Sequence, residues 1–258
     1  INKVSKRDLE SLNPKFSNIP NLKIGKVGIE KKFEKFMAGE PGHSVFETDA
    51  KGKFVKQVSF NKGKNGNDLF TTLDTDIQIA AYNALKNESG SIVVMNNYGE
   101  IISLVSSPSY DSNLFTYGIS KKEYSSYIKN EKKPLANKAL SSLYPPGSTI
   151  KMLVILSALE NNVINKNFTM TCKESTEYFG QKYHCWKENG HGVVNLKKAI
   201  SESCDIYFYE VARLLGVDRL NETAKRFGLG QYVFDGFIEE KKGVVPSTKW
   251  KKKYVGET

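Results

Sequence analysis

The sequence predicts an α+β fold in which helices pack against an antiparallel sheet. Two observations carry this prediction. Apolar residues recur with helical spacing over residues 75–87, and two short apolar runs, 90–95 and 100–105, follow on either side of a Gly-containing turn. A second helical pattern begins at Ser148 and continues through Glu160. A helix, a hairpin and further helices in this order are typical of a mixed core of sheet and helix.

The chain changes character at Leu69, and this predicts two domains, residues 1–68 and 69–258. The first is rich in Lys, Gly and Asn and holds an alternating run at 44–48, so we expect a small strand-rich domain. Its turn signals are Pro41-Gly42, Lys51-Gly52 and Asn65-Gly66. In the second domain, Asp74 precedes the first helical pattern and is expected to cap it.

Composition indicates a globular, basic protein. The 258 residues are 39% hydrophobic and 26% charged, with a net charge of +10. A basic surface suits nucleic acid, anionic lipid or an anionic substrate, and scattered solvated lysines explain the charge equally well. No run approaches the roughly 20 apolar residues of a membrane helix. The chain opens at Ile1 without a signal peptide, so we expect it to be a segment of a longer protein.

Ser148 and Lys151 form an S-x-x-K pattern at the predicted start of a helix, directly after a Pro-Pro-Gly turn. Residues three apart on a helix share one face, so the lysine amine can serve as a base for the serine hydroxyl. The N-terminus of a helix also favours an anionic nucleophile. The alternative is that Ser148 only caps the helix.

A second polar motif, Ser203-Cys204-Asp205, follows downstream. In an extended loop, alternate side chains point the same way, so Ser203 and Asp205 can face a cleft while Cys204 faces away. Such a serine can pass a proton to a leaving amine, and such an aspartate can hold either Lys151 or the backbone of a substrate. The alternative is a cap for a helix that begins at Ile206.

All three cysteines and two of the three histidines fall between residues 172 and 204. Cys172, Cys185, His191 and Cys204 make a ligand set that suits tetrahedral Zn²⁺ in a structural site. A disulfide and buried free thiols are the alternatives. His184 is a weaker candidate ligand than His191 because it adjoins Cys185, and His43 is expected on the surface.

The run 143–151, with its Pro-Pro-Gly-Ser-Thr-Ile-Lys sequence, resembles the nucleophile motif of class B penicillin-binding proteins. Residues 91–109 resemble the hairpin that opens their transpeptidase domain. Gly28-Ile29-Glu30 and Pro41-Gly42 resemble the pedestal region before it. Within this class the chain is most like the elongation-type enzymes, penicillin-binding protein 2. The segments that match this subgroup are His184-Cys185-Trp186, Gly190-His191-Gly192 and Glu202-Ser203-Cys204-Asp205.

The resemblance implies the penicilloyl serine transferase fold, with residues 1–68 as the end of a pedestal domain and 69–258 as the first part of the transpeptidase domain. It implies D,D-transpeptidation, with Ser148 as nucleophile and Lys151 as general base, and with Ser203 and Asp205 as the residues of the family's second motif. The amide of Ser148 would supply half of the oxyanion hole.

The same resemblance implies partners and a location. The substrates would be peptidoglycan stem peptides that end in D-Ala-D-Ala, and beta-lactams would acylate the same serine. Protein partners would be a membrane glycosyltransferase and scaffold proteins of the elongation complex, and nucleic acid is not expected. The catalytic domain would lie in the periplasm, held to the inner (cytoplasmic) membrane by an anchor outside this chain. The metal site would correspond to Cys172, Cys185, His191 and Cys204.

One departure from the family pattern concerns its third motif, Lys-Thr/Ser-Gly. Lys241-Lys242-Gly243 lacks the hydroxyl residue, and Ser247-Thr248-Lys249 has the wrong order. We expect the motif beyond Thr258, so this segment alone can be inactive. Two other functions stay open at this point: a beta-lactamase or beta-lactam sensor, and a zinc-stabilised module without catalysis.

Overall fold

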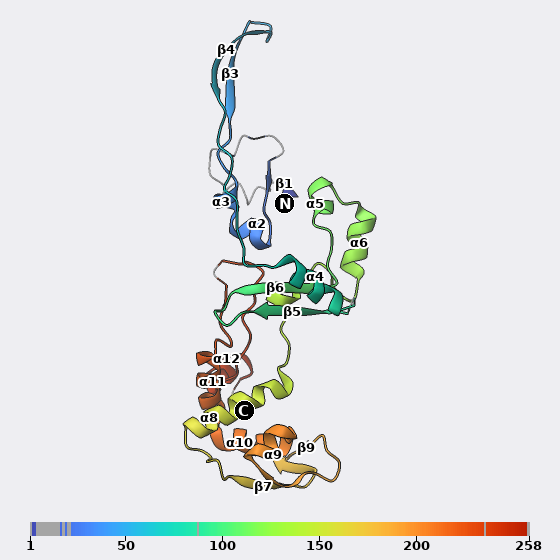
Figure 1. The fold of residues 1–258 in the computed structure, drawn as a ribbon, viewed down its shortest axis with the longest axis vertical. Coiled ribbons are helices and arrows are strands. Elements are labelled where there is room, and N and C mark those ends of the chain that lie inside the picture. The colour runs from blue at the N-terminus through green and yellow to red at the C-terminus, as the bar shows by residue number, and fades with distance from the viewer. Residues whose placement is uncertain are drawn as a thin grey trace. The chain divides into compact units, whose positions relative to one another are not determined.

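The computed structural model describes residues 2–3, 16, 19, 22–86, 88–234 and 236–256, and Figure 1 labels its elements along the chain. The chain forms two compact units. The first comprises residues 1–142 and 234–241, and the second comprises residues 143–233 and 242–258. The predicted domain boundary at residues 68 and 69 lies inside the first unit and stays a prediction. In the described part of the chain, no helix has the length and apolar character to cross a membrane.

The first unit begins with short elements. They are β1 (Asn2–Lys3), β2 (Lys23–Ile24), α2 (Gly28–Lys32) and α3 (Glu34–Met37). β1 pairs antiparallel with β2. Part of the predicted strand-rich domain lies outside the described residues.

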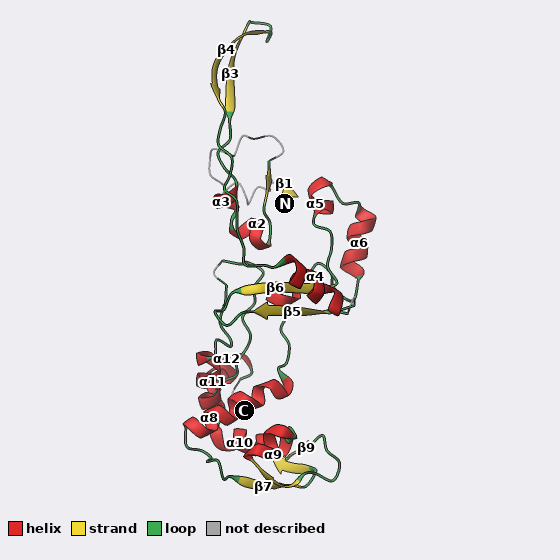
Figure 2. Ribbon diagram, viewed as in Figure 1, coloured by secondary structure: helices red, strands yellow, loops and turns green. Residues whose placement is uncertain are grey.

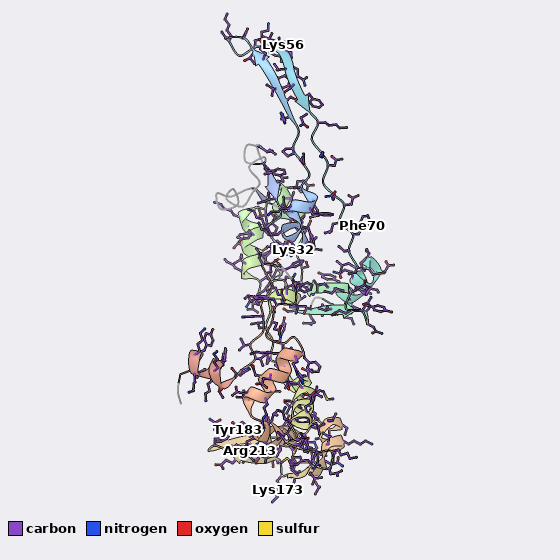
Figure 3. The ribbon with its side chains drawn as sticks, turned by 90° about the vertical axis from the view of Figure 1, so that its left-hand side faces the viewer. Lys32, Lys56, Phe70, Lys173, Tyr183 and Arg213 are labelled. Carbon is purple, nitrogen blue, oxygen red and sulfur yellow. The ribbon has the colours of Figure 1, made fainter. Side chains whose placement is uncertain are left out.

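A long hairpin follows, in which β3 (His43–Thr48) pairs antiparallel with β4 (Phe54–Asn61). The turn falls at the predicted Lys51-Gly52, and the predicted strand over 44–48 is confirmed. Every residue of both strands is exposed, and Figure 3 shows Lys56 on this hairpin. Phe46 and Phe54 pack edge to face across it, with their ring centroids 5.6 Å apart.

The predicted helix and hairpin of the first unit are both present. Asp74 caps α4 (Thr75–Ala84) by accepting a hydrogen bond from the backbone N–H of Ile77 at 2.9 Å. The helix ends before residue 87 because the backbone turns to a left-handed φ of 45° at Lys86. β5 (Gly90–Met95) pairs antiparallel with β6 (Ile101–Ser107). The Gln78 amide of α4 bonds both the N–H and the C=O of Leu104, which fastens the helix to β6.

Three further helices complete the first unit: α5 (Asn113–Tyr117), α6 (Lys121–Lys129) and α7 (Lys138–Ser141). A capping box between Ser120 and Glu123 begins α6. The segment 234–241 joins this unit through a hydrogen bond from Lys241 N to Leu140 O at 3.0 Å.

The second unit is mainly helical, with two small antiparallel strand pairs, β7 with β10 and β8 with β9 (Figure 2). Its strands are β7 (Thr169–Cys172), β8 (Ser175–Tyr178), β9 (Gln181–His184) and β10 (Gly192–Asn195). Its helices are the 3₁₀ helix η2 (Gly147–Ile150), α8 (Lys151–Glu160), α9 (Leu196–Ser201), α10 (Asp205–Leu215), α11 (Val217–Arg226) and α12 (Thr248–Tyr254).

The core of the second unit gathers the apolar faces of α8 and α10. Val154 and Ala158 of α8 share this core with Val211 and Leu215 of α10, all of them buried. Burying a valine or leucine side chain is worth about 1.5–3 kcal/mol. This packing fixes the first residue of α8, Lys151, relative to the first residue of α10, Asp205.

A buried hydrogen bond ties α8 to α11. Thr223 Oγ1 donates to Ser157 Oγ at 2.9 Å, and both residues are buried. Such a bond between two buried hydroxyl groups satisfies atoms that would otherwise be costly to bury. The three helices α8, α10 and α11 therefore form one rigid support for the residues at the start of α8.

Candidate active site and metal cluster

Ser148 lies in η2, at the exposed end of the helical segment that continues as α8. Gly147 precedes it with a φ of 56°, a left-handed conformation that glycine adopts without steric cost. Thr149 Oγ1 donates to Pro146 O at 2.6 Å, which ties the 3₁₀ turn to the Pro-Pro-Gly segment. The predicted helix start is thus a 3₁₀ turn, and it presents the Ser148 hydroxyl to solvent.

Lys151 is held by several partners while only 13% of its side chain is exposed. Its ammonium donates to Ser203 O and to Ser203 Oγ, each at 2.9 Å, and to Asp205 Oδ1 at 2.5 Å. It also lies 5.3 Å from the centre of the Phe208 ring, within range of a cation–π contact. The position of the amine is therefore fixed by charge, by hydrogen bonds and by a buried aromatic ring.

Ser203 stands between the predicted nucleophile and the predicted base. Its hydroxyl lies 3.1 Å from Ser148 Oγ and 2.9 Å from Lys151 Nζ. Among the described residues no direct hydrogen bond joins Lys151 Nζ to Ser148 Oγ, so the connection between them runs through Ser203. Hydroxyl groups both donate and accept, so Ser203 can carry a proton from Ser148 to Lys151.

The backbone of this motif differs from the expected extended loop. Ser203 has a φ of 51°, in the left-handed region, and Asp205 is already the first residue of α10. Cys204 is the N-cap residue of α10, but its side chain makes no capping bond. The expected side-chain pattern is nevertheless present, because Ser203 and Asp205 reach Lys151 while Cys204 points into the cysteine cluster.

Asp205 uses both carboxylate oxygens. Oδ1 accepts from Lys151, and Oδ2 accepts from the backbone N–H of Trp186 at 3.1 Å. The carboxyl group is 22% exposed, so its charge is only partly screened by water. Asp205 therefore joins the start of α8 to the loop after β9.

The four predicted metal ligands converge. Cys172 ends β7, Cys185 follows β9, His191 precedes β10, and Cys204 precedes α10. One ligand atom from each residue lies within 4.8 Å of the others, and all four residues are buried. The three cysteines are free thiols in the structure, with no disulfide among them. Gly190 makes this approach possible, because a Cβ there would lie 2.2 Å from Cys172 O.

The His191 ring is oriented toward the thiols. Its Nδ1 lies 3.6 Å from Cys172 Sγ and 3.4 Å from Cys185 Sγ. Its other nitrogen, Nε2, is buried without a hydrogen-bond partner among the described residues and lies 3.7 Å from a carboxylate oxygen of Glu202. A histidine that binds a metal through Nδ1 and faces a carboxylate through Nε2 has the usual arrangement of a metal ligand.

The cysteine environment affects two pKa values in opposite directions. Burial, with smaller contributions from Cys172 and Cys185, raises the pKa of the Cys204 thiol to about 12. Burial also acts to raise the pKa of Cys185, but the backbone amides of Lys187, Asp205 and Ile206 outweigh it, so this pKa is lowered. The four residues therefore include one thiol whose pKa is lowered, Cys185, and one whose pKa is raised, Cys204, and a bound cation would favour the thiolate form of both.

Three residues that contact the site were not predicted to take part in it: Trp186, Glu202 and Phe208. They contact Asp205, His191 and Lys151 respectively. Trp186 and Glu202 adjoin a predicted ligand and a predicted catalytic residue, and they stand in segments that resemble the family subgroup, but no role was predicted for either. Nothing in the spacing indicated that Phe208 would face the amine of Lys151.

Comparison with known proteins identifies the family. The model of the penicillin-binding protein transpeptidase domain matches residues 90–258, and that of the penicillin-binding protein dimerisation domain matches residues 1–71. The chain belongs to the penicillin-binding protein transpeptidase family.

Similar proteins agree with this assignment. The peptidoglycan D,D-transpeptidase MrdA of Acinetobacter baumannii is 37% identical over 257 residues, which cover 97% of this chain and 38% of that protein. The structure of Helicobacter pylori PBP2 in complex with MreC has a TM-score of 0.88 and 32% identity, and the match covers 99% of this chain and 48% of that one. A structure of a peptidoglycan synthase complex that coordinates polymerization and crosslinking has a TM-score of 0.79 and 26% identity, and covers 98% of this chain and 46% of that one.

The chain thus spans less than half the length of each of these similar proteins. Their structural similarity confirms the predicted α+β fold of the penicilloyl serine transferase type. The predicted resemblance to penicillin-binding protein 2 is confirmed as well.

Proposed function

We propose that the protein containing this chain is a peptidoglycan D,D-transpeptidase that cross-links stem peptides through an acyl-enzyme on Ser148. The observation that carries the proposal is the continuous chain from Ser148 Oγ through Ser203 Oγ to Lys151 Nζ and Asp205 Oδ1. An exposed serine hydroxyl linked in this way to a positioned amine meets the geometric requirement for a nucleophile activated by a base.

The proposed reaction would use this geometry in the following steps. Ser148 Oγ attacks the carbonyl carbon of the penultimate D-Ala while its proton passes through Ser203 to Lys151, which acts as the general base. The peptide C–N bond breaks, and the terminal D-Ala leaves as an amine that takes a proton back along the same chain. The amine of a neighbouring stem peptide then attacks the Ser148 ester and restores the serine. Beta-lactams acylate Ser148 by the same first step, with the ring C–N bond as the bond that breaks.

The test of this function uses the full-length protein with stem peptides that end in D-Ala-D-Ala. Release of free D-Ala together with cross-linked product is the expected result, and Ser148→Ala should abolish both. Rapid turnover of penicillin without cross-linking would indicate a beta-lactamase instead. Release of D-Ala that persists in Ser148→Ala would contradict the proposed nucleophile.

We propose further that Cys172, Cys185, His191 and Cys204 hold a structural Zn²⁺. Three sulfurs and one imidazole nitrogen fit a closed tetrahedral site, with every position filled by protein and none left for a reactive water. The cation would stabilise the Cys204 thiolate, whose pKa is otherwise raised to about 12 by burial. Such an ion would fix Cys204 and, with it, the two catalytic residues on either side.

Metal content tests the zinc proposal. Protein purified without chelator should contain one zinc per chain, and chelation under denaturing conditions should leave all three cysteines open to alkylation. Binding should weaken as the pH falls, because the ligand thiols must lose protons. A metal-free protein in which peptide mapping finds two of the three cysteines joined would mean a disulfide.

We propose that the protein acts in cell elongation, anchored in the inner membrane with this chain in the periplasm, together with a membrane glycosyltransferase and scaffold proteins. The similarity to MrdA, to PBP2 bound to MreC and to the peptidoglycan synthase complex supports this proposal. Depletion of the protein in a rod-shaped cell should then give round cells. Filaments that fail to divide would instead indicate a role in septation.

A further inference from the structure

Trp186 is an unusual residue to find exposed beside a catalytic motif. It is one of two tryptophans in the chain, and 64% of it is exposed. Despite this exposure, both its backbone and its side chain take part in specific contacts. Trp186 directly follows Cys185, a proposed metal ligand, so its contacts start from the edge of the Cys/His cluster.

The two hydrogen bonds of Trp186 reach both sides of the Ser203-Cys204 pair. Its indole Nε1–H donates to the carbonyl of Glu202 at 3.0 Å, and its backbone N–H donates to Asp205 Oδ2 at 3.1 Å. Glu202 immediately precedes Ser203, and Asp205 immediately follows Cys204. One residue therefore holds the two ends of the catalytic motif.

Ser203 needs such support because its backbone is strained. A φ of 51° is unfavourable for a residue with a Cβ, and such a conformation persists only where the surroundings hold it in place. The backbone N–H of Ser203 makes a bond to Ile200 O, and its carbonyl accepts from Lys151. The indole of Trp186, in the loop after β9, also restrains the backbone just before Ser203 through its bond to Glu202 O. Loss of this bond would free that part of the backbone.

Trp186 is also in contact with the cysteine cluster. Its ring meets the ring of His191 edge to face, with the centroids 5.5 Å apart. The Glu202 whose carbonyl it binds places a carboxylate oxygen 3.7 Å from His191 Nε2. Trp186 thus adjoins Cys185 in sequence, His191 through its ring, and the catalytic motif through its hydrogen bonds.

We propose that Trp186 is a positioning residue that links the order of the Cys/His cluster to the Asp205–Lys151 pair. The inference rests on the proposed acyl-transfer function of Ser148. In this role Trp186 touches no reacting atom. It acts through Asp205, whose second oxygen it holds, and through Glu202, which sets the path of the backbone into Ser203.

The first test compares Trp186→Phe with Trp250→Phe in the full-length protein. Phe keeps an aromatic ring but lacks the indole N–H. Trp250 is the matched control because it lies on α12, where its ring contacts Tyr254. Trp186→Phe should lower the second-order rate constant for acylation by fluorescent penicillin about 5-fold, as expected for one lost hydrogen bond, while the final extent of acylation stays complete. Trp250→Phe should leave the rate constant unchanged.

The second test asks whether the indole bond to Glu202 acts through Ser203, since Trp186→Phe removes this bond and keeps the backbone bond to Asp205. If it does, Trp186→Phe should cause little further loss of acylation rate in a Ser203→Ala background, because coupled residues are not additive. Hydrogen exchange over residues 200–206 should be faster in Trp186→Phe, and the metal content should match that of the wild type because all four proposed ligands remain.

Several outcomes would overturn the inference. These are an unchanged acylation rate in Trp186→Phe, a loss that is fully additive with Ser203→Ala, or a loss of rate accompanied by loss of the metal. Failure of the underlying function looks different, because the wild-type full-length protein would then form no adduct with penicillin at all.

Discussion

Asp205→Asn is the change that tests the catalytic geometry most sharply. The two carboxylate oxygens of Asp205 accept from two donors, Lys151 Nζ and Trp186 N–H. An asparagine amide has one oxygen and one NH₂ group, so in either orientation one of these donors faces another donor. The substitution also leaves the ammonium of Lys151, which is 13% exposed, without its counter-charge.

The size of the effect follows from these contacts. A hydrogen bond to a charged group contributes about 1.5–3 kcal/mol. Removal of one partner from a fully buried ion pair costs more, about 3–5 kcal/mol, but both groups here are partly exposed. Since about 1.4 kcal/mol is a factor of ten, we expect acylation of Ser148 to slow by about 10- to 100-fold.

The assay is the second-order rate constant for acylation of the full-length protein by fluorescent penicillin. Asp218→Asn is the matched control, because both oxygens of Asp218 also accept hydrogen bonds, from the N–H and the hydroxyl of Thr248. The control variant should acylate within about twofold of the wild type, since a surface change of this kind is usually small. A wild-type rate in Asp205→Asn would show that Lys151 works without the carboxylate and would refute the reasoning.

Three further predictions concern the second unit. Ser203→Ala should slow acylation by about 10²-fold or more because it interrupts the path from Ser148 to Lys151, and an unchanged rate would exclude the relay. Leu215→Ala should destabilise the protein by about 2–4 kcal/mol in urea denaturation, whereas Leu214→Ala, on the exposed side of α10, should cost much less; equal losses would contradict the described core. The hydrogen bond from Arg213 lowers the pKa of Glu210, and burial acts in the opposite direction. Because the pKa is lowered on folding, ionised Glu210 stabilises the fold, and this contribution is lost as the pH falls through the lowered pKa. Glu210→Gln should therefore be less stable than the wild type at pH 7, and the gap should close below about pH 4; a gap that widens in acid, or one equal to that of exposed Glu222→Gln, would count against this assignment.

Local signals allowed much of the fold to be predicted from the sequence. Asp74 caps α4 as expected, and the hairpin of β5 and β6 lies where two short apolar runs and a Gly-containing turn placed it. These features depend on neighbouring residues, and their side-chain chemistry is visible in the sequence. The end of α4 was placed too late, because nothing in the local pattern indicated the left-handed backbone at Lys86.

The candidate site was predicted as a set of residues, but its connections were not. Cys172, Cys185, His191 and Cys204 lie close together, and their role as metal ligands stays a prediction. The left-handed backbone of Ser203 could not be predicted, because serine carries no preference for it and the surrounding contacts impose it. The same holds for the indirect path from Lys151 to Ser148, which depends on how α8 packs against α10.

The most direct test of the proposed nucleophile is the location of the penicillin adduct. The full-length protein is treated with benzylpenicillin, digested, and analysed by mass spectrometry of its peptides. The geometry of Ser148, Ser203 and Lys151 predicts one covalently bound drug on the peptide that contains Ser148, and no adduct in Ser148→Ala. An adduct on any other residue of the wild-type protein, or one that persists in Ser148→Ala, would contradict the assignment of Ser148 as the catalytic serine.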